Sequence, residues 1–572
     1  MKSVPDNPIG RLIATESKPT TTSNVRFWLD PDARLKPFDI VRMVPPNKGD
    51  GEFYVIIDEI SQVTDEHSLL TGFISSDFGQ PTVQPRVNRV ATTYADGTVL
   101  YNTKNNEMPV PYGSTVHWPE KEGVREALGI ADIRNPVPAG FITMSGPQRE
   151  TMSIPVDMDA DYLIGPEGAH INISGISGLA TKTSYGMFLL SAIQQKQQKP
   201  EFSGEQAAFV ILNVKGNDLL SLDEDADNLT DSEKNQWKDC GLEAKSFQNV
   251  SYFYPFSRMA NHVQSYVGKD QLQKQLEKKN AYRYHYDVST AISRLKFLFE
   301  DIEDPNQTLV SCAEHTVEHF LSSDSLSPTW NRFKEQVKKW ADKTTTVKEI
   351  PVVSWRRFSR LTNQRFKNDL FAQKVNEADK LFQVPLRHFH RCLKPGHAVV
   401  IDIARLPDYL QSYVVGDIIA TLLDSDFDTS IEDESDNDIL NGGESDIAKK
   451  AKKVVLFADE LNKYAPKIGK ARTLTASLRE VSERGRSLGL VLFGAEQFRT
   501  SVDERVTGNA GSQVFGRTTP VEVNRAAETK DLPKSQKSGL PRLHKGELLL
   551  QHPRFTAATL KINFPKNAYK TG

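Results

Sequence analysis

The chain has 572 residues, 38% hydrophobic and 25% charged, with a formal net charge of −3. Its length exceeds the roughly 250–300 residues at which one hydrophobic core stops growing, so we expect two or three domains. The bulk charge excludes an electrostatic case for nucleic-acid binding by the whole molecule, and no apolar run approaches the roughly 18 residues of a membrane span. The first residues lack the apolar core of a signal peptide, and three scattered cysteines cannot form a disulfide framework, which favours a soluble cytoplasmic protein with no membrane partner.

Short strand patterns fill the amino-terminal region. The segments "GRLIATES", "NVRFWLD", "FDIVRMV" and "EFYVIIDEI" are separated by clusters of Pro, Gly, Asn and Asp. Closely spaced strands of this kind favour a small barrel. A Pro-rich connector over 135–147 follows, so we predict an N-terminal β-barrel domain over residues 1–150.

Beyond residue 150, strand patterns alternate with helix patterns, which is typical of a parallel sheet with crossover helices. The predicted fold class is therefore α/β. Some 180 residues rich in helical pattern separate two of the strands, too many for an ordinary crossover, so we predict an inserted helical subdomain. The predicted strands are "AHINIS", "AAFVILNV", "AVVIDIA", "VVLFA" and "LGLVLFGA", and the predicted domains are a core of 151–225 and 390–572 with an insertion over 226–389.

A degenerate phosphate-binding loop follows the first core strand. The usual pattern is G-x-x-x-x-G-K-[ST], but here Gly175 lies seven residues before Lys182, and Thr181 replaces the second glycine. We expect the loop backbone to wrap the phosphates of ATP, with Lys182 neutralising the β- and γ-phosphates and the Thr183 hydroxyl on Mg²⁺. A plain strand–turn–helix in the core explains the loop equally well. The predicted nucleotide-binding residues are Gly178, Leu179, Ala180, Thr181, Lys182, Thr183 and Ser184.

An acidic pair ends another apolar strand. In "VVLFADEL", Asp459 would enter the Mg²⁺ shell and Glu460 would polarise the attacking water. The alternative is a strand capped by a solvated acidic turn. Thr183 and Asp459 are thus the predicted metal ligands, and the two motifs together favour a site for ATP and Mg²⁺.

The segment "SERGRSLGLVLFGAEQFR" supplies further candidates. Its strand finishes at Glu496 and Gln497, at the sheet edge where Asp459 should lie, so Gln497 could sense the γ-phosphate. Arg484, Arg486 or Arg517 could reach the nucleotide of a neighbouring subunit as an arginine finger. For each single arginine, a surface or salt-bridged side chain is the competing explanation.

These motifs together resemble a known family. The strand-rich amino terminus, the P-loop, "ADELNKYAP", "SERGRSLGLVLFGAEQFR" and "KGELLLQHPRFTAATLKINFP" resemble HerA, of the HerA/FtsK superfamily of hexameric ATPases, over roughly 5–215 and 395–565. The resemblance implies a RecA-like P-loop core and a homohexameric ring that pumps double-stranded DNA, commonly with a nuclease partner. Bacterial relatives serve in antiphage defence beside sirtuin-type NADase or nuclease effectors.

The resemblance also implies residue roles. It assigns the lysine and threonine of the loop to Walker A, the acidic pair to Walker B, and the glutamine after the last strand to the sensor position, namely Lys182, Thr183, Asp459, Glu460 and Gln497. The loop departs from the family's usual G-x-G-K-[ST] ending, which puts the catalytic rate in question more than nucleotide binding.

Three functional hypotheses remain open. The first is an ATPase of the DNA translocase or helicase type, the second a nucleotide-binding ring scaffold with little hydrolysis that activates a partner, and the third a DNA-binding protein without nucleotide. Two weaker signals are the basic, aromatic segment 354–367, either a nucleic-acid surface or a solvated helix face, and the acidic segment 424–446, which we interpret as a mobile loop.

Overall fold

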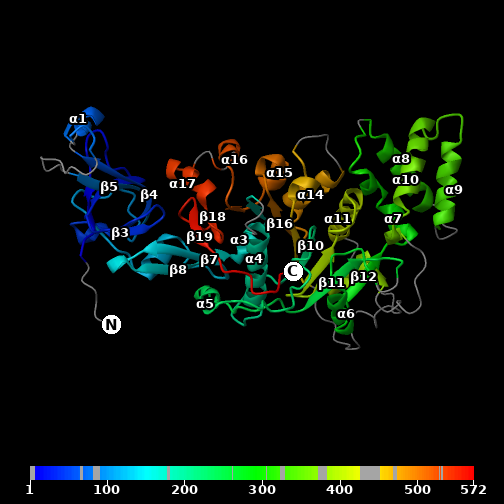
Figure 1. Cartoon of the computed structure of the whole chain (residues 1–572), viewed down its shortest axis with the longest axis horizontal. Helices are drawn as coiled ribbons and strands as arrows, with labels where there is room; N and C mark the ends of the chain where they lie inside the picture. The colour runs from blue at the N-terminus through cyan, green and yellow to red at the C-terminus, as the bar shows by residue number, and fades with distance from the viewer. Residues whose placement is uncertain are drawn as a thin grey trace. The chain divides into compact units, whose positions relative to one another are not determined.

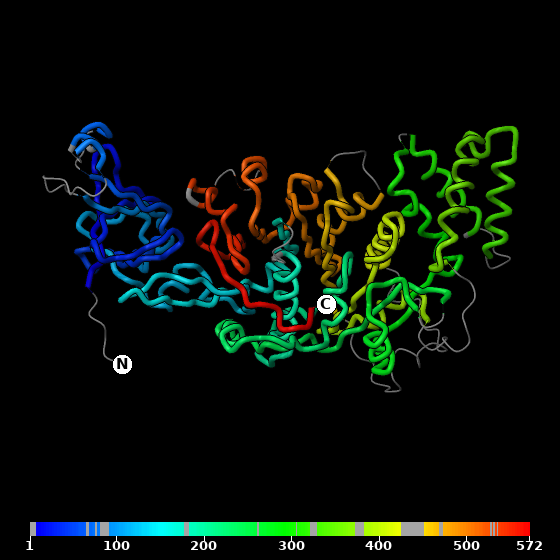
Figure 2. Tube along the Cα trace, in the orientation of Figure 1, coloured from blue at the N-terminus to red at the C-terminus, as the bar shows by residue number. Residues whose placement is uncertain are grey.

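The computed structural model divides into two compact units. Figures 1 and 2 show the chain coloured by residue number, from blue at the N-terminus to red at the C-terminus. Unit 1 comprises 1–159, 239–241 and 515–564, and unit 2 comprises 160–238, 242–514 and 565–572. The predicted domain limits at 150, 225 and 389 stay predictions. The acidic segment, apart from Asp424, lies outside the described residues, which are 7–64, 68–75, 77–80, 91–176, 181–259, 262–304, 306–321, 329–371, 383–424, 451–467, 473–526, 529 and 532–571.

Unit 1 begins with the predicted barrel, which is confirmed. Six strands close in the order β1-β2-β5-β4-β3-β6, and neighbouring strands of the barrel pair in the antiparallel sense. Alternate residues of β2 point inward, so Val25, Phe27 and Leu29 reach the barrel core. The strands are β1 (Gly10–Ile13), β2 (Asn24–Leu29), β3 (Ile40–Val44), β4 (Phe53–Thr64), β5 (Ala91–Asn102) and β6 (Thr115–His117).

The rest of unit 1 contains antiparallel strands and short helices. Strand β19 pairs with both β18 and β7, and β7 pairs with β8. The strands are β7 (Pro136–Ser145), β8 (Thr151–Asp159), β18 (Glu547–Gln551) and β19 (Leu560–Asn563); the helices are α1 (Leu69–Ser75), α2 (Lys121–Ala127), α16 (Pro520–Arg525) and α17 (Lys534–Gly539), with single 3₁₀ turns at Lys48–Asp50, Pro147–Arg149 and Leu540–Arg542.

Unit 2 is built on a parallel-rich sheet, so the predicted α/β class with a RecA-like core is confirmed. The strand order is β13-β12-β11-β14-β10-β15-β16-β9-β17, with parallel pairing from β13 through to β9. All residues of β10, β14 and β16 are buried, as expected for strands covered on both faces. The bounds are β9 (Ile171–Ser174), β10 (Ala207–Asn213), β11 (Val250–Pro255), β12 (Ala281–His285), β13 (Gln383–Pro385), β14 (Ala398–Asp402), β15 (Lys453–Ala458), β16 (Leu490–Glu496) and β17 (Ser512–Phe515).

Helix α4 (Thr181–Gln197) follows the phosphate loop and is buried on nearly every side. Its glutamines lie inside the core, where amide groups need partners. Gln194 donates to the carbonyls of Gln248 and Gly396 and accepts from the Gln248 amide, while Gln197 exchanges two bonds with the backbone of Ala207. These bonds are what permit burial of the polar face.

The inserted segment is helical in part and also contributes strands β11, β12 and β13 to the sheet. Helices α8, α9 and α10 pack together around aromatic side chains. The helices of unit 2 are α3 (Ala160–Leu163), α4, α5 (Asp231–Asp239), α6 (Lys269–Glu277), α7 (Val288–Ser293), α8 (Thr308–Leu321), α9 (Trp330–Ala341), α10 (Val352–Arg365), α11 (Asp408–Leu423), α13 (Leu461–Tyr464), α14 (Thr473–Arg484) and α15 (Glu504–Thr507), with 3₁₀ segments at Leu295–Phe299, Asp369–Phe371, Leu386–Cys392 and Arg499–Ser501. Within the described ranges, no helix has the length and apolar character needed to cross a membrane.

A close approach between α4 and β15 generates a stability prediction. A Cβ at Gly186 would overlap the ring of Phe457, which is fully buried on β15. We expect Gly186→Ala to lower the free energy of unfolding by about 1–3 kcal/mol, because the packed ring has no room to move. Urea denaturation measures this change. Gly539→Ala is the control, since no atom lies within 4 Å of its added Cβ, and an equal loss in both variants would contradict the packing argument.

Candidate nucleotide site

Lys182, Thr183, Asp459 and Glu460 gather at the carboxyl edge of the parallel strands in unit 2. Strand β16 pairs in parallel with β9 on one side and with β15 on the other. The phosphate loop leaves β9 at this edge, Asp459 directly follows β15, and Glu496 ends β16. The topology therefore places the start of the predicted phosphate loop near the predicted acidic pair, at the edge outside which ligands of open α/β sheets bind.

One hydrogen bond joins the two motifs. The Thr183 hydroxyl donates to Asp459 Oδ2 at 2.8 Å, and Asp459 is only 3% exposed. The other carboxylate oxygen, Oδ1, accepts the backbone N–H of Glu460 at 2.8 Å, which fixes the orientation of the group. A hydroxyl and a carboxylate meeting in this way form an oxygen donor set of the kind that Mg²⁺ prefers.

Lys182 lies beside this pair and is 5% exposed. Its ammonium nitrogen is buried and has no hydrogen-bond partner among the described residues. Burial lowers the pKa of Lys182, an effect opposed by the negative charges of Asp459, Glu496 and Glu460 and reinforced by Lys215. A buried cation without hydrogen bonds is costly, and a phosphate oxygen would supply what it lacks.

Glu460 adopts an unusual backbone conformation at φ 56° and ψ 42°, in the left-handed region. Its carboxylate is held by Lys215 Nζ at 2.9 Å, from the turn that follows β10. Although burial opposes it, the hydrogen bond to Glu460 and the charge of Asp459 hold the pKa of Lys215 above its usual value. Strained backbone of this kind persists where surrounding contacts impose it. Here the left-handed conformation orients the carboxylate of Glu460 toward Lys215.

Glu496 carries a buried carboxyl group. In the sequence, the one feature that draws attention to this residue is its position at the end of a strand. It is completely buried, and its Oε1 accepts from Asn172 on β9 at 2.9 Å, while Oε2 has no hydrogen-bond partner in the described part of the chain. Burial raises the pKa of Glu496 to about 7, against the favourable charges of Arg499 and Lys182. The pattern that could have identified it is an ionisable residue closing an otherwise apolar strand, "LVLFGAE".

The remaining predicted binding residues lie as follows. Gln497 comes directly after β16 and is half-buried. The Ser184 hydroxyl accepts from Asn567 at 3.2 Å, so its partner is the carboxyl-terminal segment of unit 2. Thr181 begins α4, and its side chain lies outside the described residues, as do Gly178, Leu179 and Ala180.

The predicted arginine fingers do not join the site of their own chain in unit 2. The guanidinium of Arg486 donates to the Glu167 carbonyl, and its own carbonyl accepts from Lys453, the first residue of β15. These contacts place Arg486, with the nearby Arg484, at the amino edge of the sheet, opposite Asp459. Arg517 belongs to unit 1 and is exposed. A role in a neighbouring subunit stays a prediction for all three.

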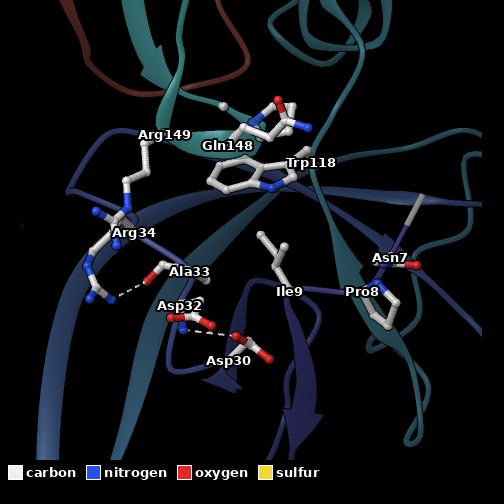
Figure 3. Close-up of a pocket in the computed structure, with 12 residues that line it drawn as sticks. Asn7, Pro8, Ile9, Asp30, Asp32, Ala33, Arg34, Trp118, Gln148 and Arg149 are labelled. Atoms are coloured by element: carbon white, nitrogen blue, oxygen red, sulfur yellow. Dashed lines mark hydrogen bonds between the residues drawn. The ribbon is translucent and has the colours of Figure 1, made fainter. Parts of the chain in front are cut away.

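Unit 1 has a pocket of about 540 Å³ that no motif indicated (Figure 3). Trp118 lies within it, with Arg34 and Arg149 on one side of the indole ring. Asp30 and Asp32 also line the pocket, so its charges are of both signs. This mixed lining does not select one class of ligand.

Comparison with known proteins gives distant structural likeness. No family model and no curated protein matches the sequence. Among solved structures, the plasmid coupling protein TrwB in complex with ADP and Mg²⁺ is 10% identical, with a TM-score of 0.40 over 73% of this chain and 88% of that one. VirB4 of Thermoanaerobacter pseudethanolicus is 14% identical, with a TM-score of 0.40 over 76% of this chain and 97% of that one.

A viral protein is also similar over a shorter range. The genome packaging NTPase B204 from Sulfolobus turreted icosahedral virus 2, in complex with ATP-γ-S, is 14% identical with a TM-score of 0.19 over 33% of this chain and 70% of that one. At such TM-scores and identities, none of these likenesses assigns an activity to this chain, and the site stands on its own geometry.

The raised pKa of Glu496 generates a prediction about pH. Between its ordinary value of 4.5 and about 7, the folded chain keeps a proton that the unfolded chain releases, so stability falls as pH rises through this window. We expect Glu496→Gln, which can still accept from Asn172, to gain stability relative to wild type at pH 8 but not at pH 4, by at most about 3 kcal/mol. Urea denaturation at both pH values measures it, and a difference independent of pH would contradict the burial argument.

Proposed function

We propose that this chain is a Mg²⁺-dependent ATPase whose nucleotide site is the carboxyl edge of the sheet in unit 2. The observation that carries the proposal is the hydrogen bond of 2.8 Å between Thr183 and Asp459, residues that lie 276 positions apart. Beside it lies the ammonium of Lys182, for which the described part of the chain supplies no hydrogen-bond partner. Separate motifs, each ambiguous alone, converge on one small volume.

The residues present fit a nucleotide with its metal. The Thr183 hydroxyl and the Asp459 carboxylate would hold Mg²⁺, which when bound neutralises the phosphate oxygens and polarises the bond that breaks. Lys182 would bind the β- and γ-phosphates. Glu460 would orient the attacking water and accept its proton, with Lys215 released from the carboxylate.

The assembly is proposed from the sequence motifs. We infer a HerA-like homohexamer in the cytoplasm, with ATP at each subunit interface and with Gln497 as the sensor of the γ-phosphate. We propose that Arg484, Arg486 or Arg517 acts as an arginine finger on the nucleotide of a neighbouring subunit, a role supported for Arg486 by its contact with the Glu167 carbonyl, away from the site of its own chain. The ring would translocate or unwind double-stranded DNA and work with a nuclease or sirtuin-type NADase effector in antiphage defence.

A second function is favoured by the ion pair between Lys215 and Glu460. While this pair persists, the base that hydrolysis needs is neutralised at 2.9 Å. The chain would then be a ring scaffold that binds ATP, hydrolyses it slowly and assembles and activates a partner effector. The altered phosphate loop agrees with slow turnover.

Turnover measurements test the ATPase. We expect Lys182→Ala to reduce kcat/KM for ATP at least about a hundredfold, because it removes a charge that stabilises the transition state. Glu460→Gln should reduce kcat by about 10²–10⁴ while ATP·Mg²⁺ still binds, because only the proton acceptor is removed. Lys234→Ala, an exposed lysine on α5, is the control. Equal turnover in all four proteins would refute the assignment.

A further substitution separates the two functions. Lys215→Gln frees Glu460 from its partner, and since a half-exposed ion pair contributes about 0.2–1 kcal/mol, we expect a rise in kcat of up to about fivefold. Steady-state ATP hydrolysis with and without duplex DNA measures it. Tight binding of ATP·Mg²⁺ with negligible turnover under every condition, including this variant, would favour the scaffold.

A further inference from the structure

The helical pair α9 and α10 concentrates positive charge. Residues 329–367, which we call the α9–α10 surface, contain eleven of the 71 lysines and arginines of the chain but only three of its 74 acidic residues. The two helices lie side by side in unit 2 (Figure 1) and pack through Trp340 and Trp355, whose ring centroids are 4.7 Å apart. The charges are therefore displayed on a rigid support.

Most of these cations face solvent without a counter-charge. Nine are exposed, and in the part of the chain that the structure describes none of the nine forms an ion pair: Arg332, Lys334, Lys338, Lys339, Lys343, Lys348, Arg356, Arg360 and Lys367. By contrast, the buried Arg365 at the end of α10 forms an ion pair with Asp301. Within the helices, Lys334 and Lys338, like Arg356 and Arg360, stand four residues apart, where like charges destabilise a helix. A bound polyanion would relieve this repulsion.

The aromatic residues of the segment decide which polyanion fits. All six are buried in the core, namely Trp330, Phe333, Trp340, Trp355, Phe358 and Phe366. No ring is left for stacking on the bases of a single strand, and the surface lacks the aromatic centre typical of a protein interface. Val353 is the exposed large hydrophobic residue of the segment. Charge without rings suits the phosphate backbone of a duplex.

We propose that the α9–α10 surface binds the phosphate backbone of double-stranded DNA without reading its sequence. The inference rests on the proposed function in one respect, because DNA is the substrate that the ring would move. It adds to that function a place of contact outside the nucleotide site, on the inserted segment. The net charge of −3 for the whole chain does not reveal the local excess of positive charge on this surface.

Binding of a short labelled DNA duplex of random sequence, followed by fluorescence anisotropy without nucleotide, tests the proposal. The test variant carries Lys334→Gln, Lys338→Gln, Lys339→Gln and Arg360→Gln. We expect at least about tenfold weaker binding at about 50 mM salt, and a slope of log affinity against log salt that is smaller by about one for each phosphate that is no longer neutralised. A second duplex of different sequence should show the same change.

The control variant has the same reduction of charge elsewhere in unit 2. It carries Lys234→Gln, Lys238→Gln, Lys269→Gln and Lys274→Gln, all exposed on α5 and α6. Its affinity should change less than about twofold, because these side chains lie on other helices. Basal ATP turnover of both variants should equal that of wild type, since none of the eight residues belongs to the nucleotide site. The melting temperature of the test variant should not fall below that of wild type, because removing like charges that stand four residues apart does not destabilise a helix.

Three outcomes would overturn the proposal. The first is a wild-type protein that binds no duplex, and the second is equal duplex binding by the two variants. The third is tighter binding of polyglutamate than of the duplex at the same salt, which would indicate an acidic protein partner. The proposed ATPase fails separately, through turnover that does not depend on Lys182. Weakened duplex binding by the test variant would stand even in that case.

Discussion

The adjacency of β9, β16 and β15 is the constraint on which the candidate site depends. In the observed register Glu496 lies opposite Ser174, and Gly494 opposite Ala458, so the three strands end almost level. A slip of one residue would turn each side chain to the other face of the sheet and separate Thr183 from Asp459. The chemistry proposed for unit 2 is therefore a consequence of strand pairing, and the residues that secure that pairing are the apolar ones.

Much of this arrangement could be predicted from the sequence because its signals are local. Alternating residues identify the barrel, unbroken apolar runs identify the central parallel strands, and Asp459 directly follows one of them. Glu496 could not be assigned a role, because its environment comes from Asn172 on a strand more than 300 residues earlier. The ion pair of Glu460 with Lys215 could not be predicted either. It depends on the left-handed backbone conformation of Glu460, which the spacing of apolar residues in the sequence does not indicate.

The inserted segment illustrates a second limit of sequence patterns. Its apolar and aromatic periodicity indicated helices correctly, yet β11 and β12, rich in tyrosine and phenylalanine, sit in the same sheet as the core strands. Composition over the whole chain hid the uneven distribution of charge as well. Burial of every aromatic ring in 329–367 separates an apolar interior from a basic exterior, and only coordinates reveal which side each residue takes.

The glutamines of α4 have a mechanical consequence. The amides of Gln194 and Gln197 fasten the rear of the helix to the backbone at Gln248, Gly396 and Ala207, through bonds worth about 1 kcal/mol each. A pull applied at the front turn cannot slide the helix along its axis unless these bonds break together. Because Thr183 and Ser184 in the first turn also bond to Asp459 and Asn567, the helix is held at both ends, and a load at Lys182 passes to the strands and segments that surround it.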